Sequence, residues 1–490
     1  MDARPVEVEV HLGQGLPDFH LVGLPSVAIR EARRRVRSAV MNSEEAWPQR
    51  RITANLAPGD LRKDGVLFDL PLALGVLAAN GRIGQAVLSR YMFIGELALD
   101  GRVRPVRGAL AAALTAKERG YEGLVVPKEN AYEAALVPGP QVVGVGHLTD
   151  AVAFLTGKKE AAPVSSNAAE LLSSARYEGP DFSEVRGQAL AVRALEIAAV
   201  GGHNVLMVGP PGCGKTMLAE RLPGILPPLS EDEAMETTRV WSVAGLLGAE
   251  QPMVVRRPFR APHHHASAPA IIGGGSPVPR PGEISLAHHG VLFLDELPLF
   301  SRSVLEALRE PLEQGRVTVA RQGVTATFPA SVCLVAAANP CVCGRFGDPA
   351  VPCDCPPPRL DSYRSRLSGP LLDRIDLHVE VPRLTEEELY RVEPSETSAA
   401  IRGRVVQARD FRLERQDSCG DQDDRSISSL DPSVRRFLRR SAEMSGCSAR
   451  GLTSVLRVAR SIADLAQSAK IEDEHVAEAI QYRRSVWRTS

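Results

Sequence analysis

The feature that most constrains the fold of this chain is a glycine-containing segment of eight residues near its middle. The segment has the spacing G-x-x-x-x-G-K-[ST], in which backbone N–H groups, unobstructed by side chains, can surround phosphate groups. It consists of Gly209, Pro210, Pro211, Gly212, Cys213, Gly214, Lys215 and Thr216. The apolar run at 204–208 predicts a buried parallel strand before it, and residues 215–222 predict a helix whose N-terminus faces the phosphates. Together they predict a phosphate loop in an α/β sheet.

Two side chains at the end of this loop suit a nucleoside triphosphate that carries magnesium. Lys215 supplies a positive charge for the β- and γ-phosphates, and the hydroxyl of Thr216 is a ligand for Mg²⁺. A second predicted strand, at 290–294, ends in Asp295 and Glu296. We expect Asp295 to hold Mg²⁺ and Glu296 to polarise the attacking water as general base.

A third predicted strand, at 331–338, ends at Asn339, directly before Pro340. An amide at the end of a strand beside the γ-phosphate can orient the attacking water, and it can also serve the turn that Pro340 introduces. The two roles are compatible, so we predict that Asn339 contributes to catalysis.

Hydrolysis leaves negative charge on the γ-phosphoryl oxygens, which one lysine and one Mg²⁺ do not fully offset. Residues 369–376 predict a short helix with Arg374 at its tip. Alternatively, Arg374 only pairs with Asp373 or Asp376, but the shortage of positive charge favours a catalytic role in a neighbouring copy. An arginine that each copy donates onward implies a head-to-tail ring that closes.

Length and composition limit the class of protein. The chain has 490 residues, a formal net charge of −1 and eight cysteines, which predicts several domains and a reducing compartment. No apolar run approaches the ~20 residues of a membrane span, and the first residues are no signal peptide, so we expect a cytoplasmic protein without a membrane partner. Because the net charge is near zero, DNA binding would have to come from local patches.

Several segments together carry a specific resemblance. The order of phosphate loop, Asp-Glu strand, asparagine strand and Leu-Leu-Asp-Arg resembles the AAA+ ATPases. Four further segments are similar to the magnesium-chelatase-like ComM/YifB proteins, and the resemblance covers essentially the whole chain. They lie at 257–265, 272–276, 280–288 and 339–344. The resemblance implies that Arg450, at the start of a helix, is the second sensor and a lid-side contact to phosphate.

The same resemblance implies an α/β architecture in three parts. A Lon-C-like α+β domain comes first, a P-loop AAA+ domain with a parallel sheet follows, and a helical lid domain ends the chain. The predicted boundaries are 1–157 for the first domain, 158–180 for a linker, 181–382 for the ATPase domain and 383–490 for the helical domain. Family members generally carry further residues before the strand predicted at 6–10, where this sequence has five. Either the start codon is assigned late or a first edge strand is missing.

The N-terminal part is similar to the C-terminal domain of Lon proteases, through residues 95–105 and 126–130. Lon-type proteolysis needs a serine nucleophile and a lysine. The corresponding segment at 63–69 contains no serine, and the helix after Arg107 has no lysine before Lys117. Because the serine nucleophile and its lysine base are both absent from these segments, we expect the fold without the protease chemistry, used for assembly or DNA contact.

Two arginine-bearing segments are candidates for DNA contact. Residues 316–328 alternate on both sides of 321–323, which predicts a β-hairpin with a basic turn. In ring motors that this chain resembles, such a hairpin points into the central channel, so Arg316 and Arg321 would follow a DNA backbone. A peripheral hairpin with incidental arginines is the alternative. The arginine-rich helix face at 26–42 is ordinarily solvated, with DNA contact as the less favoured reading.

Two clusters contain metal-binding side-chain types. Cys341, Cys343, Cys353 and Cys355 form the pattern C-x-C-x9-C-x-C. Four thiolates can complete a tetrahedral zinc shell, and four free thiols in a reducing compartment are an equally good interpretation. The run 263–265 consists of three histidines, but we predict no metal there, because side chains adjacent in sequence point apart.

These features predict an ATPase that uses ATP and magnesium and assembles as a nucleotide-dependent homohexamer around branched or single-stranded DNA. The resemblance implies branch migration of joint molecules during natural transformation. The main alternative is a chelatase-type motor subunit that drives magnesium insertion into a porphyrin. An ATP-dependent protease and a switch that binds ATP without moving DNA are further alternatives.

Overall fold

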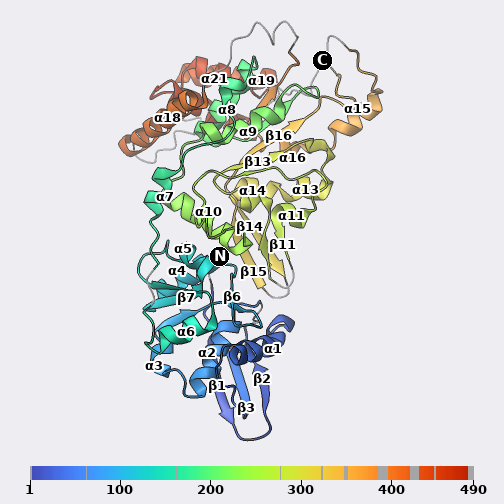
Figure 1. Ribbon diagram of the computed structural model, residues 1–490. Coiled ribbons are helices and arrows are strands. Elements are labelled where there is room, and N and C mark those ends of the chain that lie inside the picture. Colours follow the sequence, from blue (N-terminus) through green and yellow to red (C-terminus); the bar gives the residue numbers. More distant parts are fainter. Residues whose placement is uncertain are drawn as a thin grey trace.

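The computed structural model describes residues 3–61, 63, 65–160, 164–275, 278–321, 324–346, 351–384, 396–419, 430–445 and 449–483. In Figure 1 the N-terminal part lies at one end of an elongated molecule, the central part with the parallel sheet in the middle, and the C-terminal helices at the other end. No helix among the described residues is long and apolar enough to cross a membrane.

The N-terminal part contains two three-stranded sheets and a short hairpin. The sheets have the strand orders β1-β3-β2 and β4-β7-β8, and β5 pairs with β6. The strands are β1 (Glu7–Gly13), β2 (Asp18–Val22), β3 (Arg51–Ala57), β4 (Tyr91–Phe93), β5 (Glu96–Leu97), β6 (Val103–Arg104), β7 (Gly123–Pro127) and β8 (Gln141–Val145). The helices are α1 (Val27–Asn42), α2 (Asp69–Ala79), α3 (Gln85–Leu88), α4 (Ala109–Arg119), α5 (Ala131–Ala134) and α6 (Leu148–Leu155).

Local sequence explains why these elements form. The hydroxyl of Ser26 caps α1 by accepting the N–H of Ile29, and the predicted helix at 26–42 is thereby confirmed. Ile29 and Val36 of α1 are buried in a core that also contains residues of β3, α2 and α6. The predicted alternating strand at 6–10 is confirmed as β1, which turns valines toward this core and leaves glutamates exposed.

The central part is built on a five-stranded sheet in the order β10-β13-β16-β9-β17, and all its neighbouring strands are parallel. Its strands are β9 (Val205–Val208), β10 (Phe259–Arg260), β13 (Val291–Leu294), β16 (Cys333–Ala338) and β17 (Leu377–Glu380). Two small antiparallel hairpins accompany it: β11 (Gly273–Gly274) with β12 (Arg280–Pro281), and β14 (Arg316–Arg321) with β15 (Val324–Pro329). The predicted α/β class with a parallel sheet is confirmed.

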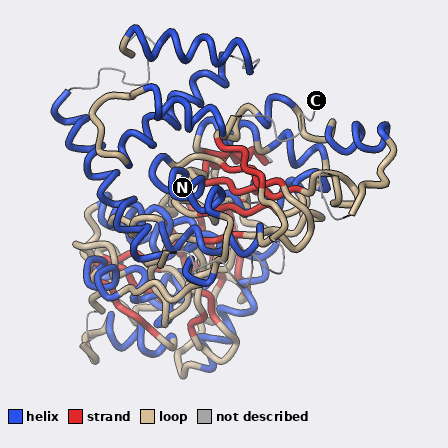
Figure 2. The backbone as a smooth tube through the Cα atoms, turned by 90° about the horizontal axis from the view of Figure 1, so that it is seen from above, coloured by secondary structure: helices blue, strands red, loops and turns tan. Residues whose placement is uncertain are grey.

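Helices cover both faces of this sheet, as Figure 2 shows from above. Alternate residues of the strands enter two different cores: Val205 and Met207 pack with α8, α9 and C-terminal helices, while Leu206 and Val208 pack with α11, α12 and α13. A parallel sheet with two covered faces needs strands that are apolar throughout, which is why β9 and β13 are uninterrupted apolar runs. The helices are α7 (Ala168–Ser174), α8 (Ala189–Gly201), α9 (Lys215–Ile225), α10 (Glu231–Ala244), α11 (Ala268–Ile272), α12 (Glu283–Leu286), α13 (Arg302–Ala307), α14 (Arg309–Gln314), α15 (Pro357–Arg364) and α16 (Gly369–Leu372).

The segment 158–180, predicted as a linker, contains helix α7. Asn167 caps this helix by accepting the N–H groups of Ala169 and Glu170. Ala168 is buried in a core that Leu110 of α4 and Ala234 of α10 also enter. The predicted linker therefore contains a short helix: seven residues are too few to show a helical period in the sequence, but a cap and a shared apolar core stabilise them.

The C-terminal part is helical, as predicted. Its helices are α18 (Ser398–Cys419), α19 (Pro432–Ser445), α20 (Ala449–Leu465) and α21 (Asp473–Gln481). Ile401 and Val405 of α18 and Leu456 of α20 join the same core as α8 and α9. The helical part is therefore packed directly on one face of the five-stranded sheet.

Candidate nucleotide site

The predicted phosphate loop lies where the sequence places it, between β9 and α9. The loop passes close to the strand beside it: a Cβ at Gly209 would lie 2.1 Å from the carbonyl oxygen of Val381. No side chain fits there, so glycine is required for the loop to leave the sheet at this point. Helix α9 begins at Lys215, and its first N–H groups face the loop.

The ammonium group of Lys215 is held inside the loop. It donates to the carbonyl oxygens of Gly209 at 2.7 Å and Pro210 at 2.8 Å, and to Oδ1 of Asn339 at 3.3 Å. The lysine is buried, so its charge acts in a poorly solvated place, where it attracts phosphate oxygens more strongly than it would in water. The contact with Asn339 also brings the end of β16 to the phosphate loop, as predicted.

Thr216 and Asp295 meet at the other side of the loop. The Thr216 hydroxyl donates to Oδ2 of Asp295 at 3.1 Å, so a hydroxyl and a carboxylate from α9 and β13 converge on one place. Oxygen donors of this kind suit a hard cation such as Mg²⁺. These two residues would hold it, and the ion would neutralise charge on the β- and γ-phosphates.

Glu296 has an unusual backbone and a partner that sequence reasoning missed. Its φ is 51°, a left-handed conformation that few non-glycine residues adopt, and its N–H donates to Oδ1 of Asp295. The carboxylate lies 3.1 Å from Nδ1 of His264. His264 follows β10, the strand that pairs with β13, and the two residues line a hollow of about 340 Å³ together with Thr216 and Asp295. Backbone strain of this kind often marks a functional residue.

Arg374 lies at the opposite edge of the sheet from the phosphate loop. The side chain of Asn204, directly before β9, donates to the carbonyl oxygen of Arg374 at 2.9 Å. The phosphate loop follows the other end of β9, and four strand residues at about 3.3 Å each put about 13 Å between the two ends. The predicted short helix is confirmed as α16, two residues before Arg374, but the structure does not bring Arg374 to its own loop.

Arg450 is found beside Arg374. Nη2 of Arg450 lies 3.4 Å from Oε1 of Glu313, and Nη2 of Arg374 pairs with Oε2 of the same carboxylate. The hydrogen bond from Arg374 lowers the pKa of the Glu313 carboxyl, which is therefore ionised at neutral pH. We call Arg374 and Arg450 the arginine pair. Residues from α14, the segment after α16, and α20 thus meet in one place, although more than sixty residues separate each from the next along the chain.

A buried polar network fixes α20 beside the arginine pair. Asp376 accepts hydrogen bonds from Ser454 and from Arg457 of α20, both at 2.6 Å, and lies 3.4 Å from Nδ1 of His203. Burial alone would raise the pKa of Asp376, but His203, Arg457 and Ser454 outweigh it and hold the pKa at about 2. Since Asp376 is two residues from Arg374, this network sets how α20 sits relative to the arginine pair.

Comparisons with known proteins agree along the whole chain. Models of magnesium chelatase match in three places: subunit ChlI at 181–389, subunit ChlI of Mg-chelatase at 8–130, and the ChlI C-terminal region at 395–483. The competence protein ComM of Haemophilus influenzae is 43% identical over 496 residues, which are 99% of this chain and 96% of that protein. The uncharacterized protein YifB of Escherichia coli is 43% identical over 497 residues, covering 99% and 95%.

The chain belongs to the magnesium-chelatase-like ComM/YifB family. Membership of this AAA+ group supports an ATPase that uses ATP with magnesium, and the predicted family is confirmed. A more distant relative, magnesium-chelatase subunit ChlI of Euglena gracilis, is 23% identical over 233 residues, which are 43% of this chain and 56% of that protein.

The predicted hairpin of this family member is confirmed as β14 and β15, with Arg321 paired to Val324; residues 322–323 lie outside the described part. Val317, Val319 and Phe328 pack on the sheet, so the other face of the hairpin is exposed. Arg316 and Arg321 are both exposed and form no ion pair with the residues that the structure describes.

The three histidines of the run 263–265 lie together, which corrects the argument that they point apart. Their ring centroids are separated by 4.2, 4.4 and 5.1 Å. The turn after β10 folds the run back on itself: the N–H of His265 donates to Nδ1 of His263, and Ala266 donates to the carbonyl of His263. The ring nitrogens Nδ1 of His263 and of His264 are engaged, so the absence of a metal here stays our prediction.

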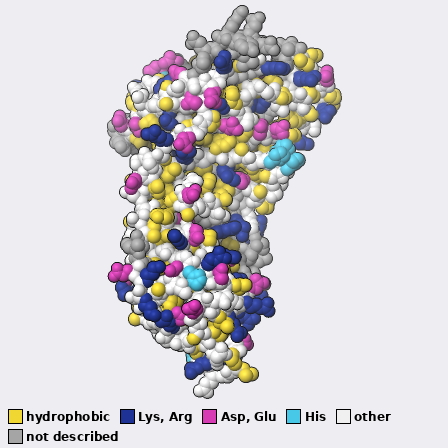
Figure 3. Space-filling model, in the orientation of Figure 1, with side chains coloured by type: hydrophobic (Ala, Val, Ile, Leu, Met, Phe, Trp, Pro, Cys, Tyr) yellow, Lys and Arg dark blue, Asp and Glu magenta, His cyan; other side chains and the backbone are white. Residues whose placement is uncertain are grey.

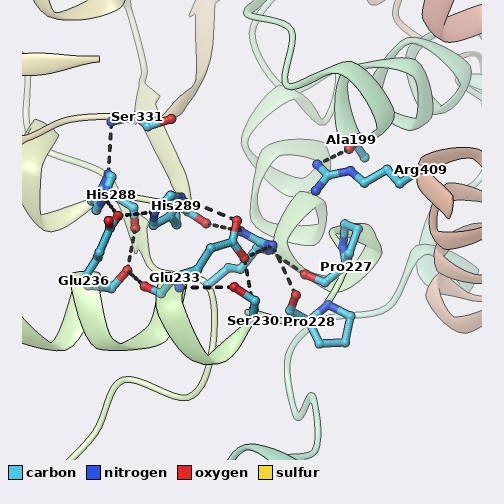
Figure 4. Close-up of polar contacts among 12 residues, drawn as sticks. Ala199, Pro227, Pro228, Ser230, Glu233, Glu236, His288, His289, Ser331 and Arg409 are labelled. Atoms are coloured by element: carbon cyan, nitrogen blue, oxygen red, sulfur yellow. Dashed lines mark hydrogen bonds and ion pairs between the residues drawn. The ribbon is translucent and has the colours of Figure 1, made fainter. Parts of the chain in front are cut away.

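A second histidine cluster joins α10 to the strand that carries Asp295. Figure 4 shows His288 and His289 directed at Glu236, with Nε2–Oε2 distances of 3.1 and 2.9 Å. Nδ1 of His288 accepts the N–H of Ser331, so the proton of its neutral ring is on Nε2 and is donated to Glu236. Burial and the neighbouring His289 lower the pKa of His288, which keeps the ring neutral. This cluster is a structural link rather than a ligand set.

Proposed function

We propose that this family member is an ATP-driven motor that assembles head to tail into a hexameric ring around DNA and drives branch migration of joint molecules. The observation that carries the proposal is the division of the catalytic groups between two edges of one sheet. One group converges at the carboxyl ends of the strands, here called the carboxyl edge: Lys215, Thr216, Asp295, Glu296 and Asn339. The arginine pair lies at the amino ends of the strands, the amino edge.

The length of β9 puts about 13 Å between the phosphate loop and the backbone of Arg374, and in the proposed ring the arginine pair acts on the nucleotide of a neighbouring copy. A neighbouring copy that places its carboxyl edge against this amino edge would receive both guanidinium groups at its γ-phosphate. Their present partner, Glu313, is half-exposed, so γ-phosphate oxygens can compete for the same donors. A head-to-tail contact of this kind closes into a ring. Each ATP would then be hydrolysed between two copies.

Within one site, the roles follow from the contacts. Glu296 is the general base for the attacking water, and Asn339 orients that water while it holds Lys215. The arginine pair from the neighbour stabilises charge on the γ-phosphoryl oxygens. The pairing of Glu296 with His264 ties the base to the insert between β10 and β13.

DNA contact is proposed for the exposed arginines of the β14–β15 hairpin, Arg316 and Arg321. In Figure 1 this hairpin runs from the nucleotide-binding part toward the N-terminal part. Figure 3, drawn in the same orientation, shows many Lys and Arg side chains on this face of the N-terminal part. Arg30, Arg34 and Arg37 of α1 are exposed at helical spacing and offer a second basic surface. The name ComM of the H. influenzae relative links that protein to competence.

The N-terminal part is proposed to be a Lon-like fold without protease activity. In the segment that corresponds to the Lon nucleophile, Lys63 is buried and its ammonium pairs with the carbonyl of Pro58. Asp69 pairs with Arg35 of α1 at 2.7 Å. Both ionisable groups therefore serve the fold, which supports a role in assembly rather than acyl transfer.

The test is ATP hydrolysis by the full chain with and without a four-way DNA junction that has homologous arms. We expect hydrolysis to rise with the junction, and the junction to be converted into duplex products only with ATP. Glu296→Gln is the control, because it should bind ATP and DNA without moving the junction. Stimulation by a porphyrin with chelatase partner subunits, and none by DNA, would instead support a chelatase-type motor.

A further inference from the structure

We propose that Cys341, Cys343, Cys353 and Cys355 bind a zinc ion, and that this metal site braces the phosphate loop and Asn339. The four residues, hereafter the cysteine cluster, belong to the loop between β16 and α15. The described residues of that loop, 340–346 and 351–356, form neither helix nor strand. Such a segment has little apolar core of its own, and a metal clip is a common means of fixing it.

The sulfur atoms already have the spacing of a tetrahedral thiolate shell. Cys341 and Cys343 are 3.3 Å apart at Sγ, and Cys353 lies 3.6 and 3.5 Å from them. All four Sγ atoms lie within 4.8 Å of one another. A Zn–S bond of about 2.3 Å gives a tetrahedron with edges of about 3.8 Å, which these separations approach. They are far longer than a disulfide bond of about 2.05 Å.

Backbone groups support the thiolates. The N–H of Phe346 donates to Sγ of Cys341 at 3.3 Å, and the N–H of Cys355 donates to Sγ of Cys353 at 3.5 Å. Hydrogen bonds to the ligating atoms are typical of the outer shell of a metal site. The guanidinium of Arg364 lies 4.7 Å from the ring centroid of Phe346 and adds positive charge near the cluster.

The chemistry of the ligands selects the metal. Four soft thiolates in a tetrahedron favour zinc or iron, and hard cations such as Mg²⁺ avoid them. A closed shell of four protein ligands is the arrangement of structural zinc sites, which leave no position for substrate. In the two other described groups of metal-ligating side chains, ring nitrogens already have protein partners. The cysteine cluster is therefore the better candidate.

The cluster lies against the nucleotide site. Cys341 is two residues after Asn339 and is fully buried. A Cβ at Gly344, between the two pairs of cysteines, would lie only 2.5 Å from Cδ of Pro211 in the phosphate loop. The hydroxyl of Tyr363, in α15 beyond the cluster, donates to the carbonyl of Asn339 at 3.3 Å. Loss of the metal would therefore release the residues that position Asn339 and one side of the phosphate loop.

The first measurement is the metal content of the untagged full-length protein, by plasma mass spectrometry after gel filtration. We expect about one zinc per chain, and near zero in Cys343→Ser and in Cys355→Ser. Cys419→Ser, at the end of α18, is the matched control and should keep its zinc. Cobalt substitution should give the absorption of tetrahedral thiolate coordination. Wild-type protein that carries no zinc, iron in its place, or cysteines paired as disulfides would each overturn the proposal.

The second measurement is the affinity of the protein for a fluorescent ATP analogue. It tests the bracing role, which rests on the proposed function. We expect affinity to fall about tenfold in the zinc-free variants and to be unchanged in Cys419→Ser. If the wild-type protein binds zinc but the zinc-free variants bind the ATP analogue with unchanged affinity, the bracing role is wrong and the metal site remains. Failure of the wild-type protein to bind ATP would instead count against the proposed function, since the zinc content does not depend on it.

Discussion

The two edges of the ATP-binding sheet hold different kinds of charge and are built in different ways. At the carboxyl edge, residues close to strand ends assemble within one protomer: Lys215 follows β9, Glu296 follows β13 and Asn339 follows β16. At the amino edge, Arg374 and Arg450 arrive from two separate parts of the chain and share Glu313. In the function that we propose, the first edge binds the nucleotide of its own protomer, and the second supplies positive charge to the nucleotide of a neighbour. The comparison suggests that each protomer carries half of two sites.

The largest expected effect on ATP hydrolysis comes from substituting a catalytic residue at each edge of the sheet separately. Arg374→Ala should lower ATP hydrolysis about a thousandfold without loss of ATP binding, because a donated arginine contributes that order of rate. Glu296→Gln should do the same from the other edge. Arg302→Ala, an exposed arginine on α13, is the control and should hydrolyse normally.

Mixing the two inactive variants sharpens this prediction. A subunit contact is productive when the arginine comes from Glu296→Gln and the base from Arg374→Ala. In an equal mixture, about one contact in four meets both conditions, so about a quarter of the activity should return. If the mixture stays inactive although rings form, the arginine acts within its own protomer.

Arg450→Ala should have the next largest effect, a loss of about tenfold to a hundredfold in hydrolysis, since a hydrogen bond to a charged group is worth about 1.5–3 kcal/mol. Mixing it with Glu296→Gln distinguishes the two edges. Recovery of activity would place Arg450 with the neighbour's nucleotide, and no recovery would place it with its own.

Asp376→Asn should loosen the support of the amino edge and lower the free energy of unfolding by about 2 kcal/mol. The folded pKa of about 2 lies below the ordinary value of 3.8, so the wild-type contribution is complete above pH 3.8 and is lost as the pH falls toward 2. Thermal unfolding at pH 7 and near pH 3 measures this. The difference between variant and wild type should shrink at the lower pH; a difference that stays constant would contradict the assignment.

Arg321→Ala should have the smallest effect and should leave both edges intact. DNA affinity should fall a few-fold, and the slope of log affinity against log salt should decrease by about one, because one phosphate contact is lost. Arg321→Lys keeps the charge and should keep the slope. An unchanged slope in Arg321→Ala would exclude this hairpin from backbone contact.

The sequence predicted the carboxyl edge well because its signals are local. A phosphate loop, a strand that ends in Asp295 and Glu296, and a strand that ends at Asn339 each appear within about ten residues. Parallel strands bring such ends together without further information. The same holds for the β14–β15 hairpin, whose alternation and turn are adjacent in the chain.

The amino edge could not be predicted in the same way. The sharing of Glu313 by the arginine pair and the contact of Asp376 with Ser454 join segments whose spacing carries no period or motif. The pairing of His264 with Glu296 depends on the order of β10 and β13 in the sheet. Helix α7 was missed because its stabilising contacts come from α4 and α10. These features are set by tertiary packing, which no single local pattern records.

Helices α4 and α10 contribute to one shared apolar core, and this has a consequence for the whole molecule. Leu110 from the front of the chain and Ala234 and Met253 from the ATPase part fill the same interior, and the N–H of Gly108 donates to the carbonyl of Ser242. The N-terminal part is therefore packed against the ATPase part and is not joined to it by the linker alone. In an assembled ring it would form a second layer that moves with its own protomer. Deleting it would expose the apolar residues of this shared core on the ATPase part.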